Sequence, residues 1–459
     1  MIFSEKVQVI SQDIQNPYVI NISEELFLSW SLSLRKKYHF QCGNYSTHVV
    51  FFPDSSIKGI GMDSRLLQEL KLSTNNQNLT LFYHESAGMF SLGLVIGLLT
   101  ETRETESGPS FGSVHDFAKE LSVYCQENHV LFYVFSLKAL NVNTLEVQGY
   151  IWNGEKWELT LVPLPHVVHN RIHSRKREKS ATAEALFSLL RDKQIPFFND
   201  HFLNKWESHQ HLVQHEHLLP YLPETELLLN INQLEHFLKK HEQVFIKPIH
   251  GSQGKKIIRI ENEDDHYLLD YTTFNGDIEK KYDEILELFQ GIKPRLAKQA
   301  SIIQQGIELL TYEDRILDFR FLCHMNQSNS WKVTSSVARI SSPNEFVSNL
   351  ARGGEIQKVH KVLKDLLDTK TALDVNKMLH ELAVEVASSI GQSEEGLFGE
   401  LGIDLALDQQ AKPWIIEVNT KPSKNLDSPT SFFIVRPSAK AVIQYCMYLS
   451  NPFQRSELS

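Results

Sequence analysis

Residues 400–423 read ELGIDLALDQQAKPWIIEVNTKPS, and this is the most informative stretch of the chain. Every second residue is apolar on both sides of the polar segment 409–412, which predicts two β-strands joined as an antiparallel hairpin. If Asp408 pairs with Pro413 across a four-residue loop, the same register places Asp404 directly opposite Glu417. Their Cβ atoms would then lie about 5 Å apart on one face of the hairpin.

Two carboxylates in this position repel each other unless a cation neutralises them. A hard divalent cation with oxygen ligands would do so, and Asn419 offers a third oxygen two residues further along the same face. The alternative is a solvated edge hairpin whose carboxylates point into water. Because Lys421 and Pro422 follow at once and bring a cation and a kink beside the carboxylates, we favour the metal site.

A second informative stretch, residues 244–260, reads VFIKPIHGSQGKKIIRI. It predicts a strand that ends at Lys247, a loop with Gly251 and Gly254, and a second strand from Ile257. Glycines let backbone N–H groups approach an anion closely. The stretch has neither the spacing of a P-loop nor the helix of a dinucleotide-binding fingerprint. Alone it predicts only a hairpin, but together with the metal site it predicts a clamp for phosphate.

The composition limits the class of protein. The chain has 459 residues, enough for about three domains, with a formal net charge of −10 that gives no general attraction for nucleic acid. The apolar run at 92–99 is far shorter than the roughly 20 residues of a membrane span. The first ten residues, MIFSEKVQVI, contain no signal-peptide core, and the four cysteines are widely spaced. We therefore expect a soluble intracellular protein.

The pattern of apolar residues predicts a β-rich region over 1–90, a small α/β domain over 91–180 and a helix-rich α+β region from 181 onward. Strands are expected at 17–22, 47–52, 79–83, 92–99, 130–135 and within 159–172. Helices are expected at 114–128, 181–193, 278–289 and 375–390. Ser180 is a suitable N-cap for the second of these helices, and Gly391 a suitable stop for the last.

Several motifs occur in an order that resembles a known family. They are PHVVHNRI at 165–172, FLNKWESHQHL at 202–212 with LPYLPET at 219–225, FIKPIHGSQGKKI at 245–257, IIQQGIELL at 302–310 with DRILDFRFL at 314–322, VARISSPNEFVSNLARGGE at 337–355, and GIDLALD with WIIEVNTKPS at 402–423. Over about residues 165–450 the chain resembles the YheC/YheD group of endospore-coat-associated ATP-grasp proteins. The layout is also similar to glutathione synthetases and ribosomal-protein glutamate ligases.

The resemblance implies an α+β ATP-grasp fold, in which two α+β lobes clasp ATP. The grasp would span 181–450, after the β-rich region and the small α/β domain, and 451–459 would form a tail. The resemblance also implies ATP and Mg²⁺ as cofactors, with Mn²⁺ as the alternative metal. It assigns the metal ligands to Asp404, Glu417 and Asn419.

The other site residues are carried over motif by motif. Lys205 and Lys247 would contact the nucleotide phosphates, which the loop with Gly251, Ser252 and Gly254 would cover. Backbone groups near Gln304, Gln305 and Ile307 would hold adenine. Arg320 and Arg339 would face the transferred phosphoryl group, and Asn349 would contact substrate or phosphate.

These roles imply a ligase that phosphorylates a carboxylate with ATP and passes the acyl group to an amine or similar nucleophile. The carboxylate and the nucleophile stay unidentified; an amino acid, a peptide and a coat protein are candidates. Two alternatives remain open: a coat protein that binds ATP without turnover, and a kinase-like phosphotransferase. The resemblance places the protein in the mother-cell cytoplasm or the spore coat and leaves a homo-oligomer open.

Overall fold

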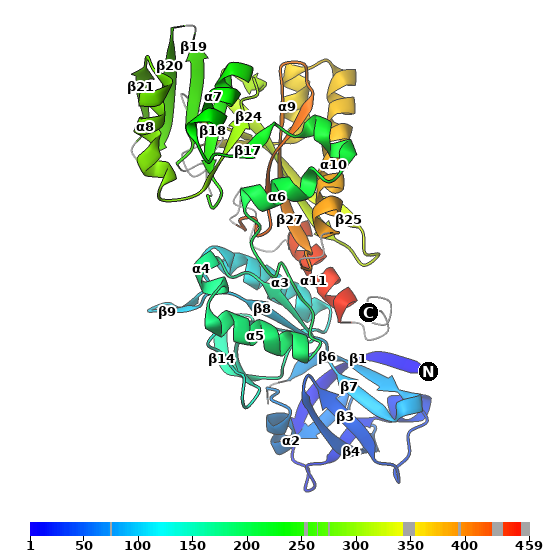
Figure 1. The fold of residues 1–459 in the computed structure, drawn as a ribbon. Helices are drawn as coiled ribbons and strands as arrows, with labels where there is room; N and C mark the ends of the chain where they lie inside the picture. Colours follow the sequence, from blue (N-terminus) through cyan, green and yellow to red (C-terminus); the bar gives the residue numbers. More distant parts are fainter. Residues whose placement is uncertain are drawn as a thin grey trace. The chain divides into compact units, whose positions relative to one another are not determined.

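The structure is a computed structural model that describes residues 1–73, 76–251, 256–263, 265–273, 276–342, 354–392, 396–424 and 435–450. The chain divides into two compact units (Figure 1). Unit 1 comprises Met1–Asp200 and Ser423–Ser459, and unit 2 comprises His201–Pro422. Each unit is described by itself.

Unit 1 begins with a closed β-barrel, which confirms the expected β-rich region. Its strands follow the order β1-β5-β2-β4-β3-β7-β6 around the barrel. They are β1 (Ile2–Gln12), β2 (Val19–Ser23), β3 (Tyr38–Cys42), β4 (Tyr45–Asp54), β5 (Ile60–Asp63), β6 (Gln77–His84) and β7 (Met89–Leu92), with helices α1 (Glu24–Ser29) and α2 (Ser64–Glu69) between them. Aromatic rings fill the interior, where Phe90 lies 4.4 Å from Phe51 and 4.4 Å from Tyr83 between ring centroids.

The second sheet of unit 1 has four parallel strands in the order β11-β8-β15-β16. These are β8 (Val95–Leu99), β11 (Leu131–Phe135), β15 (Val167–Asn170) and β16 (Phe197–Phe198), and the antiparallel strands β12 (Leu140–Asn141), β13 (Glu146–Trp152) and β14 (Trp157–Val162) extend it. The expected strand within 159–172 is therefore two strands, because Pro163 and Pro165 separate β14 from β15. A two-stranded ribbon of β9 (Arg103–Thr105) and β10 (Gly108–Ser110) stands apart.

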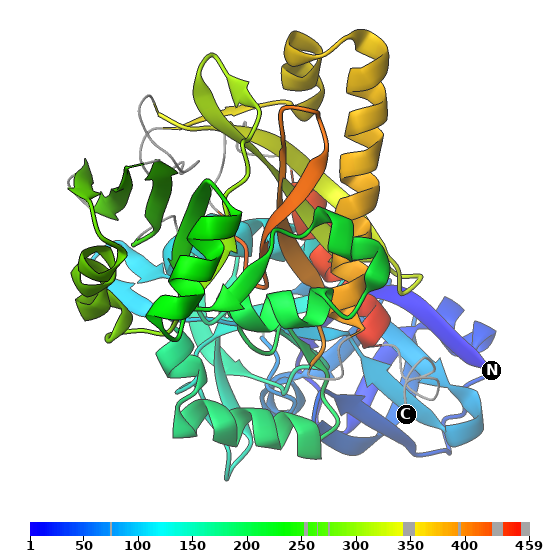
Figure 2. The same ribbon diagram turned by 45° about the horizontal axis from the view of Figure 1, so that its top comes forward.

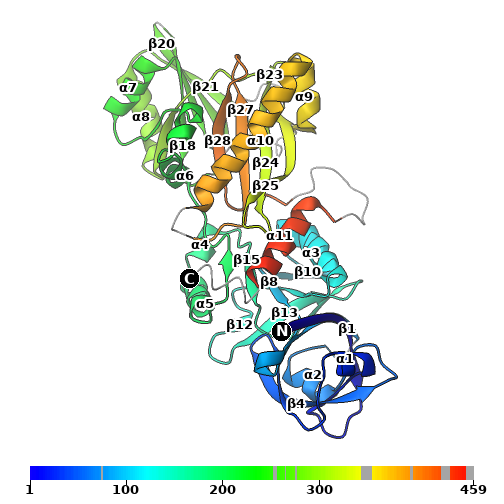
Figure 3. The same ribbon diagram turned by 90° about the vertical axis from the view of Figure 1, so that its right-hand side faces the viewer.

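Among the described residues, this part of unit 1 contains the α-helices α3 (His115–Glu127), α4 (Arg175–Glu178), α5 (Ala181–Asp192) and α11 (Pro437–Leu449). The expected helices at 114–128 and 181–193 are confirmed. Ser180 caps α5 as predicted, since its side chain accepts a hydrogen bond of 3.3 Å from the Ala183 N–H. α11 lies beside α3 and contacts β15 (Figure 3).

The first sheet of unit 2 has the order β17-β22-β18-β19-β20-β21. Its strands are β17 (Thr225–Leu227), β18 (Gln243–Pro248), β19 (Ile258–Glu263), β20 (His266–Thr273), β21 (Gly276–Tyr282) and β22 (Ser301–Gln305), and its helices are α6 (Lys205–Leu212), α7 (Ile231–Lys240) and α8 (Ile285–Leu296). The helix expected at 278–289 is wrong in its first half, because β21 continues to Tyr282 and α8 starts at Ile285. Antiparallel pairing of β21 with β20 outweighs the helical spacing of the apolar residues.

The second sheet of unit 2 has the order β26-β25-β24-β27-β28, and α10 covers it (Figure 2). Its strands are β23 (Thr311–Tyr312), β24 (Arg315–Met325), β25 (Trp331–Ile340), β26 (Glu355–Gln357), β27 (Glu400–Leu407) and β28 (Pro413–Asn419), and its helices are α9 (Val359–Leu366) and α10 (Thr369–Gly391). The helix expected at 375–390 is confirmed. It begins six residues earlier, where Asp368 caps it.

Candidate nucleotide and metal site

The hairpin of β27 and β28 places Asp404 opposite Glu417 and Gly402 opposite Asn419, so the predicted pairing of the two carboxylates is confirmed. The predicted turn is wrong, because Pro413 pairs with Leu407 and not with Asp408. The turn therefore spans residues 408–412, with Ala411 at a φ of 59°. A shift of register between Asp404 and Leu405 restores the pairing at the carboxylates.

Asp404 is neutralised by two arginines from the neighbouring strands β24 and β25. Arg320 makes a two-pronged contact, in which its Nε donates to Oδ1 of Asp404 and its Nη2 donates to Oδ2 at 2.8 Å. Nη2 of Arg339 lies 3.0 Å from the same Oδ2. Arg339 also donates two hydrogen bonds of 2.6 Å to Asp318, which sequence reasoning did not single out although it stands in the DFR motif.

Burial and charge act against each other in this cluster. Burial alone would raise the pKa of Asp404, but Arg320 and Arg339 hold the pKa of this carboxyl below its ordinary value. Burial likewise opposes the charge of Arg339, and Asp318 and Asp404 together raise the pKa of its guanidinium. The predicted placement of both arginines on adjacent strands is confirmed, and both contact Asp404.

Glu417 is paired with Lys205, the first residue of α6. The Lys205 Nζ lies 2.6 Å from Glu417 Oε1 and donates to the Gly251 carbonyl at 3.3 Å. A capping box fixes this end of α6: the Asn204 side chain accepts from the N–H groups of Trp206 and Glu207, and the Glu207 carboxylate accepts from the Asn204 N–H. The structure thus brings Lys205, Gly251 and Glu417 together.

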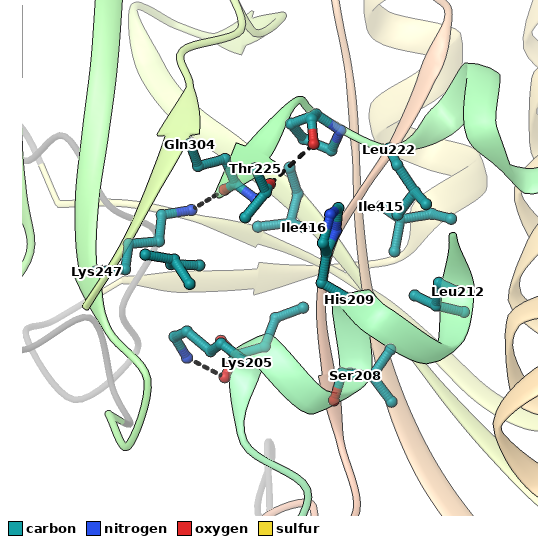
Figure 4. Close-up of a pocket in the computed structure, with 14 residues that line it drawn as sticks. Lys205, Ser208, His209, Leu212, Leu222, Thr225, Lys247, Gln304, Ile415 and Ile416 are labelled. Carbon is teal, nitrogen blue, oxygen red and sulfur yellow. Dashed lines mark hydrogen bonds and ion pairs between the residues drawn. The ribbon is translucent and has the colours of Figure 1, made fainter. Parts of the chain in front are cut away.

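The ammonium group of Lys247 donates the first of a chain of hydrogen bonds on the wall of a pocket (Figure 4). Its Nζ donates to Gln304 Oε1 at 2.6 Å, Gln304 Nε2 donates to Thr225 Oγ1 at 2.9 Å, and Thr225 Oγ1 donates to the Pro223 carbonyl at 2.9 Å. Burial and, to a smaller extent, the charge of Lys205 lower the pKa of Lys247 to about 8, and Glu417 opposes this shift. An anion bound next to this buried ammonium would stabilise its charged form.

The same pocket has an apolar side. Its lining residues are Lys205, Ser208, His209, Leu212, Leu222, Pro223, Thr225, Lys247, Ile302, Gln304, Ile415, Ile416, Glu417 and Val418. Sequence reasoning did not place Thr225 or His209 in the site, although Thr225 closes the LPYLPET motif. An apolar wall beside two lysines suits a flat aromatic base joined to phosphates.

The residues predicted to hold adenine through their backbone lie at the end of β22. The sheet already uses the Gln305 N–H, which donates to the Glu224 carbonyl at 2.8 Å, and Ile307 follows the end of the strand. Gln304 lies in the pocket through its side chain. Ser252, Gly254 and Asn349, which were also predicted as site residues, lie outside the described residues.

The residue types at the hairpin fit a divalent cation. Asp404, Glu417 and Asn419 offer carboxylate and amide oxygens from two paired strands, and these are the ligands that Mg²⁺ prefers. Within the described ranges, no group of three or more His, Cys, Asp or Glu side chains could hold a metal ion.

This combination of fold and cationic site is that of an ATP-grasp protein, and comparison with known families agrees. The family described as "YheC/D like ATP-grasp" matches residues 194–449, more than half of the chain. The protein belongs to this family. In the part of the chain that the structure describes, no helix has the length and apolar character needed to cross a membrane.

Two curated relatives and one solved structure illustrate the likeness. The chain is 27% identical over 369 residues to the endospore coat-associated protein YheD of Bacillus subtilis (strain 168), covering 79% of this chain and 78% of the relative. It is 21% identical over 356 residues to YheC of the same organism, covering 77% and 94%. The D-alanyl-alanine synthetase A of Vibrio cholerae matches with a TM-score of 0.45 and 14% identity, over 78% of this chain and 99% of that chain.

Proposed function

We propose that this protein is an ATP- and Mg²⁺-dependent carboxylate ligase that works through an acyl phosphate. A carboxylate oxygen of the substrate forms a bond to the γ-phosphorus of ATP, the bond from this phosphorus to the β,γ-bridging oxygen breaks, and ADP leaves. An amine or similar nucleophile then attacks the acyl carbon, its bond to the phosphoryl oxygen breaks, and phosphate and a proton are released. Such chemistry needs positioned cations more than a nucleophilic side chain.

The observation that supports this proposal is the set of cations on the two opposed carboxylates. Lys205 contacts Glu417, and Arg320 and Arg339 contact Asp404. In the proposed reaction, Lys205, Lys247 and the loop from Gly251 through Gly254 bind the ATP phosphates. Arg320 and Arg339 stabilise charge on the transferred phosphoryl group.

The remaining predicted residues complete the proposal. Gln304, Gln305 and Ile307 bind adenine, and Asn349 contacts substrate or phosphate. Asp404, Glu417 and Asn419 would hold Mg²⁺, which when bound neutralises the phosphate oxygens. The substrates proposed are a carboxylate and a nucleophile from among amino acids, peptides and coat proteins.

The first experiment is the melting of wild type and Glu417→Ala with and without MgATP. At about 100 times its dissociation constant, a ligand that binds only the folded state stabilises it by roughly 2.7 kcal/mol. We expect such a shift in the wild type and its loss in Glu417→Ala. A folded wild type that shows no shift would remove the ligase proposal.

A second candidate, an ATP-binding component of the endospore coat without turnover, is favoured by the names of the two relatives. Both candidates predict the melting shift, so turnover must separate them. Candidate amino acids and coat peptides are incubated with MgATP and hydroxylamine, which converts an acyl phosphate into a hydroxamate. Hydroxamate formation supports the ligase; tight MgATP binding without phosphate release under any condition supports the coat component.

A further inference from the structure

The hydrogen-bond chain on the wall of the pocket in unit 2 can run in one direction only (Figure 4). Lys247 Nζ, at one end, can only donate, so the Gln304 side chain must present its Oε1, which lies 2.6 Å away. The Pro223 carbonyl, at the other end, can only accept, so the single hydroxyl hydrogen of Thr225 is used there, at 2.9 Å. Thr225 Oγ1 therefore offers a lone pair to Gln304 Nε2, at 2.9 Å. Both ends of the chain impose the same orientation on the Gln304 amide.

The sheet holds this amide in a rigid frame. β22 lies between β17 and β18, and Gln304 stands directly opposite Thr225 on one side and Phe245 on the other. Gln304 and Thr225 are 8% and 7% exposed, so little water reaches the hydrogen bond between them. A flipped amide would turn its N–H₂ group toward the Lys247 ammonium and its oxygen toward Thr225, whose hydrogen is already used. Because buried polar groups without partners are costly, the observed orientation is strongly preferred.

The fixed amide can still form one more hydrogen bond at each of its polar atoms. In the part of the chain that the structure describes, Oε1 accepts from Lys247 and Nε2 donates to Thr225, and each atom has capacity for a second partner. An acceptor beside a donor is the complement of adenine, whose 6-amino group donates and whose neighbouring ring nitrogen accepts. Guanine and hypoxanthine carry an oxygen at position 6, so the fixed Oε1 would meet a second acceptor there.

A bound nucleotide changes which partner holds the amide. In the proposed function Lys247 binds phosphate, so its hydrogen bond to Gln304 is weakened in the complex. The Thr225 hydroxyl, which is tied to the Pro223 carbonyl, takes no part in phosphate binding and keeps its hydrogen bond to Gln304 Nε2. In the complex, the orientation of the amide therefore depends mainly on Thr225.

We propose that Thr225 makes this pocket select a 6-aminopurine nucleotide over a 6-oxopurine nucleotide, because it holds the Gln304 amide with Oε1 as the acceptor for the 6-amino group. Gln304 contacts the base, and Thr225 is a positioning residue that acts through Gln304. The inference rests on the proposed function and adds the origin of its selectivity for the base.

The test compares the binding of MgATP and MgITP to the full chain by calorimetry. ITP carries an oxygen where ATP carries the 6-amino group, and it lacks the additional 2-amino group of GTP. The variants are Thr225→Val, which has a similar shape without the hydroxyl, and Thr225→Ser, the matched control that keeps the hydroxyl. The quantity measured is the ratio of the two dissociation constants, because a merely structural loss weakens both nucleotides alike and leaves this ratio unchanged.

Wild type and Thr225→Ser should bind ATP at least about tenfold more tightly than ITP, within the range that a paired amide gives for one base over another. In Thr225→Val, no neighbour distinguishes the two ends of the amide once Lys247 contacts phosphate. The amide can then rotate and donate from Nε2 to the oxygen of ITP. The ratio should fall at least about fivefold, mainly because ITP binds more tightly.

The inference alone is overturned if wild type binds ATP without distinguishing it from ITP, or if Thr225→Val keeps the wild-type ratio; the ligase proposal then stands. It is also overturned if Thr225→Ser loses the ratio as Thr225→Val does. Folded wild type that binds neither nucleotide overturns the ligase proposal and the inference together. If Thr225→Val does not fold, Thr225→Ala takes its place under the same criteria, and Gln304→Met, which removes the amide, must lower the ratio by weakening ATP alone.

Discussion

Asp404→Asn is the substitution whose effect the structure defines most sharply. The Asp404 side chain is 6% exposed and neutralises Arg320 and Arg339, which are 18% and 13% exposed. Asparagine keeps the shape of the side chain but turns an N–H₂ group toward arginine donors and removes the charge. Breaking a buried ion pair on one side costs about 3–5 kcal/mol, since the remaining charge stays buried.

The free energy of unfolding should therefore fall by about 3–5 kcal/mol, which for a domain of this size lowers the melting temperature by roughly 2–4 °C per kcal/mol. Chemical denaturation without nucleotide measures this change. Asp374→Asn is the control, because Asp374 lies exposed on α10 and its change should stay within about 0.5 kcal/mol. Equal stability of the two variants would refute the role assigned to Asp404.

The pH dependence of folding stability tests the role of Asp404 in a second way. Because the pKa of Asp404 is held below its ordinary value, its contribution to stability is fully present above about pH 4. It is lost as the pH falls through the lowered pKa in the folded state. Asp404→Asn should show a smaller loss of stability in acid than wild type, measured from denaturation curves between about pH 5 and pH 2.

Three further results are expected. The pKa of Lys247 is about 8 without ligand, and a bound phosphate favours the charged form of this lysine. ATP binding at pH 8–9 should therefore take up a proton. Calorimetry in two buffers should detect this proton uptake, and Lys247→Met should abolish it. Gly402→Ala would place its Cβ 2.9 Å from Pro422 Cβ and should lose about 1–3 kcal/mol of stability in denaturant. Mg²⁺ alone should leave the melting temperature unchanged, and Mg²⁺ with ATP should raise it, because Lys205 already neutralises Glu417.

The sequence predicted the elements of the site better than their connections. Alternation of apolar residues suffices to find β27 and β28, because successive side chains of a strand point to opposite faces of the sheet. The predicted turn was one residue too short. A left-handed backbone conformation such as that of Ala411, and a shift of register, cannot be detected from an alternating pattern of apolar residues. The pairing of Asp404 with Glu417 was correct because the longer turn and the bulge compensate each other.

The misassigned helix at 278–289 has a different cause. The spacing of Ile278, Tyr282 and Ile285 suits a helix, but the seven residue pairs between β20 and β21 are contacts that no local pattern contains. The same holds for Asp318 and Thr225, whose roles depend on strands far away in the sequence. A motif names the residues of a site, whereas their hydrogen-bond partners depend on the tertiary structure.

The two opposed carboxylates differ in a way that bears on the order of binding. Asp404 is 6% exposed and accepts from rigid guanidinium groups, so its environment is fixed before any ligand arrives. Glu417 is 29% exposed and is paired with a flexible lysine that is also expected to bind phosphate. A triphosphate bound as proposed would compete for Lys205 and so release Glu417. The nucleotide would thereby create the second carboxylate ligand of its own metal, and metal and ATP should bind with positive coupling.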